Sequence, residues 1–257
     1  MLRTVTAIQY VTPLREGGSV PAVCGADDDG LYVVKFRGSA QGPRVLIAEL
    51  LGGEIARALD LPVPEIVFVE VDPVLARSEP DPEIQVQIRA SGGINLGLDF
   101  LPGALGFDPL LFRAPPELAS AIVWLDAYLT NVDRTARNPN MLIWHKRLWL
   151  MDHGAALYFH HSWADYRGRA RSPFPQIRDH VLLPRAGALA ALDEALAARL
   201  TPALIEGLVA QIPDAWLTPV PGLPDSAAQR AAYATYLLDR LRPPRAFVEE
   251  AIRVRTA

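Results

Sequence analysis

The sequence contains little cysteine and no long apolar run, and these absences exclude several classes of protein. Cys24 is the only cysteine in 257 residues, so an internal disulfide framework and a cysteine-based zinc site are both excluded. No stretch reaches the roughly 18 apolar residues that a membrane-spanning helix needs. The first residues also lack the continuous apolar segment of a signal peptide. We therefore expect a cytoplasmic protein without a membrane span.

Lysine is almost as scarce as cysteine. Lys35 and Lys146 are the only two lysines, against 23 arginines. Lysine is a compact charge on a thin stem, whereas arginine is a wide planar fork. A lysine kept in such a chain is therefore a candidate for a position that arginine cannot fill. The net charge of −4 gives no sign of a nucleic-acid partner, and the hydrophobic half of the chain excludes general disorder.

Hydrophobic periodicity divides the chain into a strand-rich first third and a helical remainder. The first part predicts strands over 4–11, 20–24, 31–36, 66–71 and 84–88, with a helix over 44–59. The second part predicts helices over 116–129, 187–198, 202–211, 226–241 and 244–254, a hairpin over 141–151 and an irregular loop over 160–185. Ser91-Gly92-Gly93 is the candidate hinge between the two parts.

The densest polar segment in an apolar setting lies between a predicted helix and the predicted hairpin. Asp133 is followed five residues later by Asn138, and the hairpin returns to Asp152-His153-Gly154. Carboxylate and amide oxygens suit Mg²⁺ bound together with phosphate. The spacing is that of a kinase catalytic loop and metal-binding Asp-Phe-Gly motif. Upstream, Lys35 ends a Val-Val-Lys strand, and either Glu49 or Glu54 of the next helix could pair with it.

Four segments carry a resemblance to a known family. They are YVVKF, RVLIAELLGGEIARALDLPVPE, LDAYLTNVDRTARNPNML and LWLMDHGAALYF, and they occur in order over residues 30–160. The chain resembles the HipA-like kinases, in particular the smaller members akin to phosphatidylinositol 3- and 4-kinases. The resemblance implies an α+β, bilobal, protein-kinase-like fold. It would have a small antiparallel β-rich N-lobe with one main helix over 1–90 and a larger, mostly helical C-lobe over 91–257.

The same resemblance implies ATP and Mg²⁺ as cofactors and assigns roles to the polar residues. Lys35 would bind the phosphates, Glu49 would hold Lys35, and Asp133 would be the catalytic base. Asn138 and Asp152 would be the metal ligands. Arg134 matches the basic residue after the base, and Asn140 matches a further asparagine, which we interpret as structural.

Two further segments complete the expected nucleotide site. Gly17, Gly18 and Ser19 take the place of a glycine-rich loop, and Ser19 is the candidate for regulatory autophosphorylation. The linker from Arg89 to Asn95 would give backbone hydrogen bonds to adenine in the cleft between the lobes. Asp126, one helical turn before the catalytic loop, could brace that loop.

The expected reaction is transfer of the γ-phosphoryl group of ATP to a hydroxyl, first of all a Ser or Thr of a protein. The acceptor, protein or small molecule, is not identified by the sequence. Three alternatives stay open: a pseudokinase that binds nucleotide without turnover, a lipid or small-molecule kinase, and a metal-dependent phosphohydrolase that uses His153, His160 and His161. The arginines at 167–171 and Arg178 could bind an acidic substrate, although solvated surface charges are the simpler interpretation.

Overall fold

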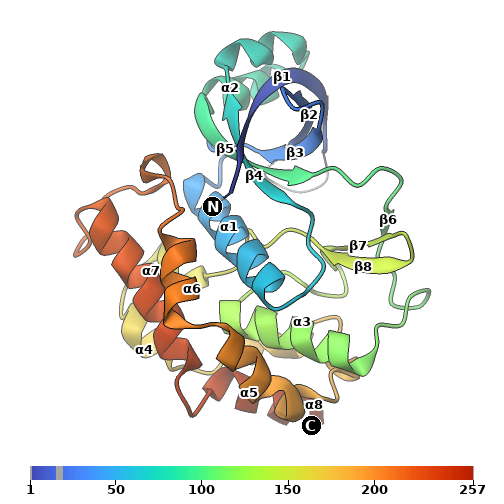
Figure 1. Ribbon diagram of the computed structural model, residues 1–257, viewed down its shortest axis with the longest axis vertical. Coiled ribbons are helices and arrows are strands. Elements are labelled where there is room, and N and C mark those ends of the chain that lie inside the picture. The colour runs from blue at the N-terminus through green and yellow to red at the C-terminus, as the bar shows by residue number, and fades with distance from the viewer. Residues whose placement is uncertain (1, 16–19, 257) are drawn as a thin grey trace.

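The first third of the chain closes into a small β-barrel (Figure 1). The computed structural model describes residues 2–15 and 20–256. The strands follow the order β1-β2-β3-β5-β4 around the barrel, with these bounds: β1 Thr4–Pro13, β2 Ala22–Ala26, β3 Leu31–Lys35, β4 Ile66–Val71 and β5 Gly93–Asp99. Strands β1 and β4 pair in parallel, and the other neighbours pair antiparallel. The expectation of a wholly antiparallel N-terminal sheet is therefore wrong at the pair that closes the barrel.

The strand predicted over 84–88 is wrong, because this segment is helix α2 (Pro82–Arg89). Alternating Ile84, Val86 and Ile88 suggested a strand, yet Ile84 and Ile88 are buried on one helical face and Val86 is 63% exposed. Asp81 caps the helix by accepting a hydrogen bond from the Glu83 N–H. Proline in the first turn and an Asp cap are start signals that outweigh three alternating residues.

The fifth strand lies after the expected hinge. Strand β5 pairs with β3 and β4, so the barrel extends to residue 99 and the boundary expected at 90/91 lies too early. Gly97 obscured this strand in the sequence, because glycine weakens strand propensity. A Cβ at Gly97 would lie 2.6 Å from Cγ2 of Val69, so the close pairing of β4 and β5 requires glycine there.

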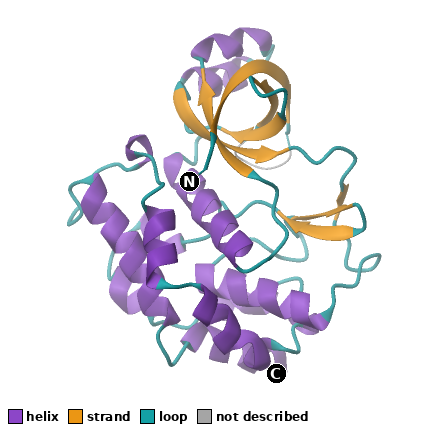
Figure 2. Cartoon of the chain, viewed as in Figure 1, coloured by secondary structure: helices purple, strands orange, loops and turns teal. Residues whose placement is uncertain are grey.

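The remainder of the chain is mostly helical (Figure 2). It contains α3 (Pro116–Leu129), α4 (Tyr166–Ala170), α5 (Leu189–Arg199), α6 (Pro202–Val209), α7 (Ser226–Leu241) and α8 (Ala246–Thr256). A three-stranded sheet of β6 (Leu105–Gly106), β7 (Met141–Trp144) and β8 (Arg147–Leu150) stands beside the helices. No described helix is long and apolar enough to cross a membrane.

Helix α1 (Pro43–Ala58) joins the two parts, because it follows β3 and packs into the larger core. The interior of the barrel forms a separate hydrophobic cluster with residues of α2. Buried α1 side chains such as Leu46 and Leu50 belong instead to the cluster that includes Trp124 of α3. Figure 1 shows α1 lying between the barrel and the helices below it. Helix α1 therefore lies against both the end of β3 and the loop that follows β8.

Candidate active site

Lys35, the last residue of β3, joins two carboxylates from distant parts of the chain. Its Nζ lies 2.6 Å from Oε2 of Glu49 in α1 and 2.7 Å from Oδ1 of Asp152. Lys35 is 7% exposed and Glu49 is fully buried. Glu54 pairs with Arg57 at 3.0 Å, so Glu49 is the carboxylate of α1 that contacts the lysine.

Mutual attraction keeps the buried side chains of Lys35 and Glu49 ionised. Burial by itself lowers the pKa of Lys35, but the charges of Glu49 and Asp152 outweigh it and raise that pKa above its ordinary value. Burial likewise raises the pKa of Glu49, but the Lys35 charge prevails and lowers it to about 2. At neutral pH Lys35 is therefore an ammonium group and Glu49 a carboxylate.

Helix α1 approaches the Asp152 loop closely because Gly52 has no side chain. A Cβ at Gly52 would lie 2.6 Å from Cβ of His153, so any larger residue would push the helix and the loop apart. The backbone N–H of His153 donates to Oε2 of Glu49 at 2.8 Å. Glu49 is thus fixed by the lysine on one side and by the loop on the other.

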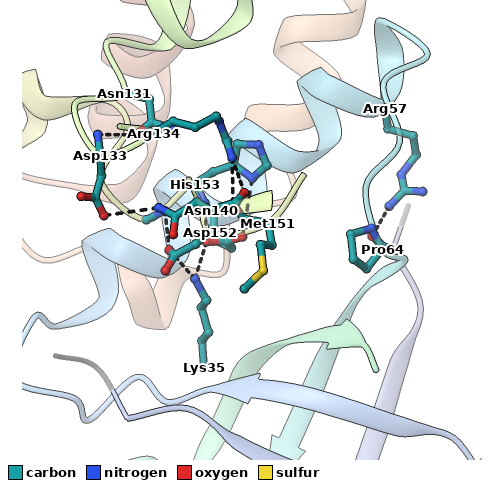
Figure 3. A network of polar contacts seen from close by, with 12 residues as sticks. Lys35, Arg57, Pro64, Asn131, Asp133, Arg134, Asn140, Met151, Asp152 and His153 are labelled. Carbon is teal, nitrogen blue, oxygen red and sulfur yellow. Dashed lines mark hydrogen bonds and ion pairs between the residues drawn. The ribbon is translucent and has the colours of Figure 1, made fainter. Parts of the chain in front are cut away.

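Asp133 lies in the loop that follows α3, and it is half-buried. The Asp133 N–H donates to Oδ1 of Asn131 at 3.1 Å. Its Oδ2 accepts hydrogen bonds from the amides of Asn138 at 2.8 Å and Asn140 at 3.3 Å. Figure 3 shows Asn140 beside Asp133, with Lys35 rising from β3 to Asp152. The two asparagine amides therefore orient the carboxylate of Asp133.

Asp126 of α3, a buried carboxylate, accepts hydrogen bonds that fix this loop against the helix. It accepts hydrogen bonds from Nε of Arg134 at 2.6 Å, Nδ2 of Asn131 at 2.9 Å and Nε2 of His180 at 2.9 Å. Nδ1 of His180 accepts the Leu182 N–H at 3.0 Å, which places the ring proton on Nε2. The expectation that Asp126 braces the loop is confirmed.

Arg134 also links Asp126 to the residues on either side of the β7–β8 hairpin. Its Nη1 donates to the carbonyl oxygens of Asn140 and Met151. The Met151 N–H donates to the same Asn140 oxygen at 3.0 Å, so these residues face each other across the hairpin. Asp152 follows at once, with a left-handed φ of 54°. Asn140 and Asp152 thus lie next to each other in the fold.

Comparison with known proteins decides the family. The model of the HipA-like kinase family matches residues 7–245. The chain belongs to the HipA-like kinase family. A solved structure, a Helicobacter pylori proinflammatory kinase named CtkA, shares the fold with a TM-score of 0.57 at 13% sequence identity. The match covers 97% of this chain and 98% of CtkA, and no curated protein matches.

The family resemblance and the assignment as a kinase are therefore confirmed, and the fold is mixed α+β. Of the residues expected to bind ATP in this HipA-like kinase, Lys35 and Asp152 meet in the site. Gly17, Gly18 and Ser19 lie outside the described residues.

Arg89 does not lie in a linker between the two parts. It ends α2 on the barrel, and its guanidinium group donates to Oε1 of Gln85 at 2.6 Å. The chain leaves the barrel only after β5, at Phe100. The segment from Arg89 to Asn95, which we expect to contact adenine, therefore belongs to α2 and the barrel and not to a linker between the two parts.

The kinase offers oxygen donors that fit a magnesium ion. Among the described residues, Oδ2 of Asp152 accepts no hydrogen bond, since Lys35 and the Gly154 N–H both contact Oδ1. Asn138 and Asn140 turn their amide nitrogens to Asp133, which leaves their carbonyl oxygens available. A carboxylate and amide oxygens are the donors that Mg²⁺ prefers when it also binds phosphate.

The histidines do not form a metal centre. No group of three His, Cys, Asp or Glu side chains within 2–15 and 20–256 is placed to hold a metal ion. His160 is buried, with Nδ1 3.0 Å from the Tyr233 hydroxyl, and His153 is buried beneath α1. A phosphohydrolase with a histidine-bound metal is therefore not supported.

Sequence reasoning missed two residues that shape the site. Asn131, two residues before Asp133, could have been recognised as a turn residue whose side chain accepts the Asp133 N–H. His180 gave no local signal, because it lies 54 residues from its partner Asp126 within the segment expected to be irregular. The isolated bridge between Thr135 and His180 joins that segment to the loop that follows α3.

Proposed function

We propose that this HipA-like kinase transfers the γ-phosphoryl group of ATP, with Mg²⁺, to a Ser or Thr hydroxyl of a protein. The observation that carries the proposal is the buried ammonium group of Lys35 held between Glu49 and Asp152. A lysine with a purely structural role needs only one carboxylate partner. Lys35 has the buried Glu49 as a fixed partner and the half-exposed Asp152 as a second one, so its charge can also neutralise a phosphate bound beside Asp152. We also propose a cytoplasmic location, where ATP is abundant.

The residues of the chain divide the work of positioning. Lys35 binds the phosphates of ATP, and Glu49 holds its ammonium group in place. Asp133 accepts a hydrogen bond from the acceptor hydroxyl and takes its proton as the new bond to phosphorus forms. The amides of Asn138 and Asn140 and the backbone contact to Asn131 fix the direction of the Asp133 carboxylate. Catalysis of this kind depends on orientation and electrostatics.

Asp152 and an asparagine amide would hold the magnesium ion. When bound, Mg²⁺ neutralises charge on the phosphates and fixes their orientation. Asn138 matches the spacing of the kinase motif, whereas Asn140 faces Met151 across the hairpin root, next to Asp152. This adjacency favours Asn140 as the partner of Asp152 and leaves Asn138 to orient Asp133. We place the adenine contacts on the backbone after β5, from Phe100 onward.

The first test is the thermal stability of the protein with ATP, with and without Mg²⁺. A ligand at 100 times its Kd stabilises the folded state by about 2.7 kcal/mol. For a chain of this length that corresponds to a rise in Tm of roughly 5–11 °C. Asp152→Ala should lose the Mg²⁺-dependent part, and Glu250→Gln, a change in a surface pair of α8, should keep it. The absence of any shift at millimolar ATP would refute the nucleotide site.

Two further measurements separate the finer assignments. Asn140→Ala should weaken Mg²⁺ dependence more than Asn138→Ala, and the reverse order would return the ligand role to Asn138. Turnover assays then compare a Ser/Thr peptide library with phosphoinositide vesicles. Labelled lipid without labelled peptide would make the protein a lipid kinase, and ATP binding without any turnover would make it a pseudokinase.

A further inference from the structure

Two arginines without carboxylate partners lie beside one exposed serine in the segment that follows Asp152. Nη1 of Arg169, in α4, donates to Oγ of Ser162 at 2.7 Å. Nη1 of Arg44, in the first turn of α1, donates at 3.3 Å to the carbonyl of His161, which is joined directly to Ser162. Within the described residues, neither guanidinium group has a carboxylate within ion-pair distance. One arginine therefore contacts this solvent-exposed hydroxyl, and the other contacts the carbonyl group of the residue before it.

The backbone at Ser162 is anchored although its side chain is exposed. The N–H groups of Ser162 and Trp163 both donate to the Phe159 carbonyl, at 3.2 and 3.0 Å. The Trp163 ring packs against Phe159 and Tyr233, with centroids 5.3 and 5.0 Å away. A group added to the Ser162 hydroxyl would thus stay beside Arg169 instead of moving away with a loose loop.

The same site connects with the catalytic cluster through α1. Arg44 lies five residues before Glu49 on that helix. The positive charge of Arg44 also reaches the ring of His161, since burial first and Arg44 second lower the pKa of that histidine. Any anion held between Arg44 and Arg169 would tie α1 to α4, and α1 is the element that positions the partner of Lys35.

We propose that Ser162 is a phosphorylation site and that Arg169 and Arg44 bind its phosphate. The proposal rests on the proposed function, because ATP at the Asp133 site supplies the phosphoryl group. Oγ of Ser162 of one molecule forms the bond to the γ-phosphorus of ATP held by a second molecule, the bridging bond to the β-phosphate breaks, ADP leaves, and the hydroxyl proton passes to Asp133 of that second molecule. The phosphate then accepts charge-assisted hydrogen bonds from both arginines, which stabilises the position of α1 and its Glu49.

The first experiment incubates the protein with Mg²⁺ and ATP and maps the modified peptide by mass spectrometry. We expect phosphate at Ser162, none in that peptide of Ser162→Ala, and full labelling at Ser162 in Ser172→Ala. Ser172 is a matched control, because it is an exposed serine of the same segment whose hydroxyl donates to the Gly168 carbonyl. Arg240 contacts only the Ser172 carbonyl oxygen, and no arginine of the described residues contacts the hydroxyl.

The second experiment installs phosphoserine at position 162 by genetic encoding, so it does not depend on the activity of the chain. We expect Tm to rise by about 3–6 °C and KM for ATP to fall. Both effects should disappear in Arg169→Ala and in Arg44→Ala, and Arg169→Lys should restore part of the rise. Each variant is compared with its own unmodified form, so a loss of stability from the substitution itself cancels.

The outcomes separate this inference from the proposed function. The inference is overturned if an added protein acceptor is phosphorylated while Ser162 is not, and if encoded phosphoserine has no effect. The kinase activity would then still stand. If the protein neither binds ATP nor turns it over, the proposed function fails. In that case an arginine-dependent rise in Tm still supports the phosphate site, and no rise overturns it.

Discussion

The ion pair of Asp126 with Arg134 is the contact whose loss should cost most stability. Both side chains are completely enclosed, and Nε of Arg134 lies 2.6 Å from Oδ2 of Asp126. Burial by itself raises the pKa of Asp126, but the Arg134 charge prevails and holds it well below the ordinary value. Removing one partner of such a pair leaves the other as an unpaired buried charge, which costs about 3–5 kcal/mol. We expect that loss for Asp126→Asn.

A double-mutant cycle isolates the pair from its surroundings. Arg134→Gln should also lose about 3–5 kcal/mol, because it removes the donors to the Asn140 and Met151 carbonyls as well. In the double variant the second substitution removes the charge that the first one left unpaired. The loss in the double variant should therefore fall short of the sum of the two single losses by at least about 2 kcal/mol.

Urea unfolding followed by tryptophan fluorescence measures these free energies, and a calorimetric scan should show Tm falling by roughly 6–20 °C. Asp239→Ala is the matched control. Asp239 pairs with Arg242 at 3.1 Å, but Arg242 is mostly exposed, so the loss should stay below about 1 kcal/mol. A loss below about 1 kcal/mol for Asp126→Asn, or strictly additive losses in the cycle, would refute the argument.

Two more predictions concern α1. Glu49→Gln should lose about 3 kcal/mol at pH 7, because the pKa of Glu49 falls from 4.5 to about 2 and each unit corresponds to about 1.4 kcal/mol. The depressed pKa means that this stability is present above about pH 4.5 and is lost as the pH falls towards 2. The difference in Tm between Glu49→Gln and wild type should therefore be smaller at pH 3 than at pH 7. An equal difference at both pH values contradicts the prediction. Gly52→Ala should lower the free energy of unfolding by about 1–3 kcal/mol, because the added Cβ clashes with His153. The control Gly207→Ala, whose Cβ lies in open space on α6, should raise it by up to about 1 kcal/mol. Equal Tm values for the two variants would count against the close approach of α1.

Much of the fold follows from local patterns. Pro116–Leu129 and Ser226–Leu241 are helices with the predicted bounds, and Ile66–Val71 is the predicted strand. Each has a strong period and clear flanking signals. The failures lie where local signals conflict. Asp81 and Pro82 begin a helix in a segment with alternating apolar residues, and Gly93 and Gly97 hide the strand β5.

The sequence by itself determined the chemical groups of the site. One retained lysine at the end of a β-rich run, two aspartates, and asparagines at fixed spacing were sufficient to indicate a kinase. These residues lie in short segments, where spacing along the chain sets geometry. The contact of Lys35 with Glu49 was also within reach, since they are 14 residues apart on adjacent elements.

Only the tertiary structure decided which groups meet across long separations. It paired Glu49 instead of Glu54 with the lysine, placed Asn140 beside Asp152, and brought His180 to Asp126. No local pattern encodes such contacts, because they arise when the packing of α1 and α3 in one core brings separate loops together. The periodicity that buries a helix face says which residues enter the core, but not which loop from elsewhere in the chain will be found opposite them.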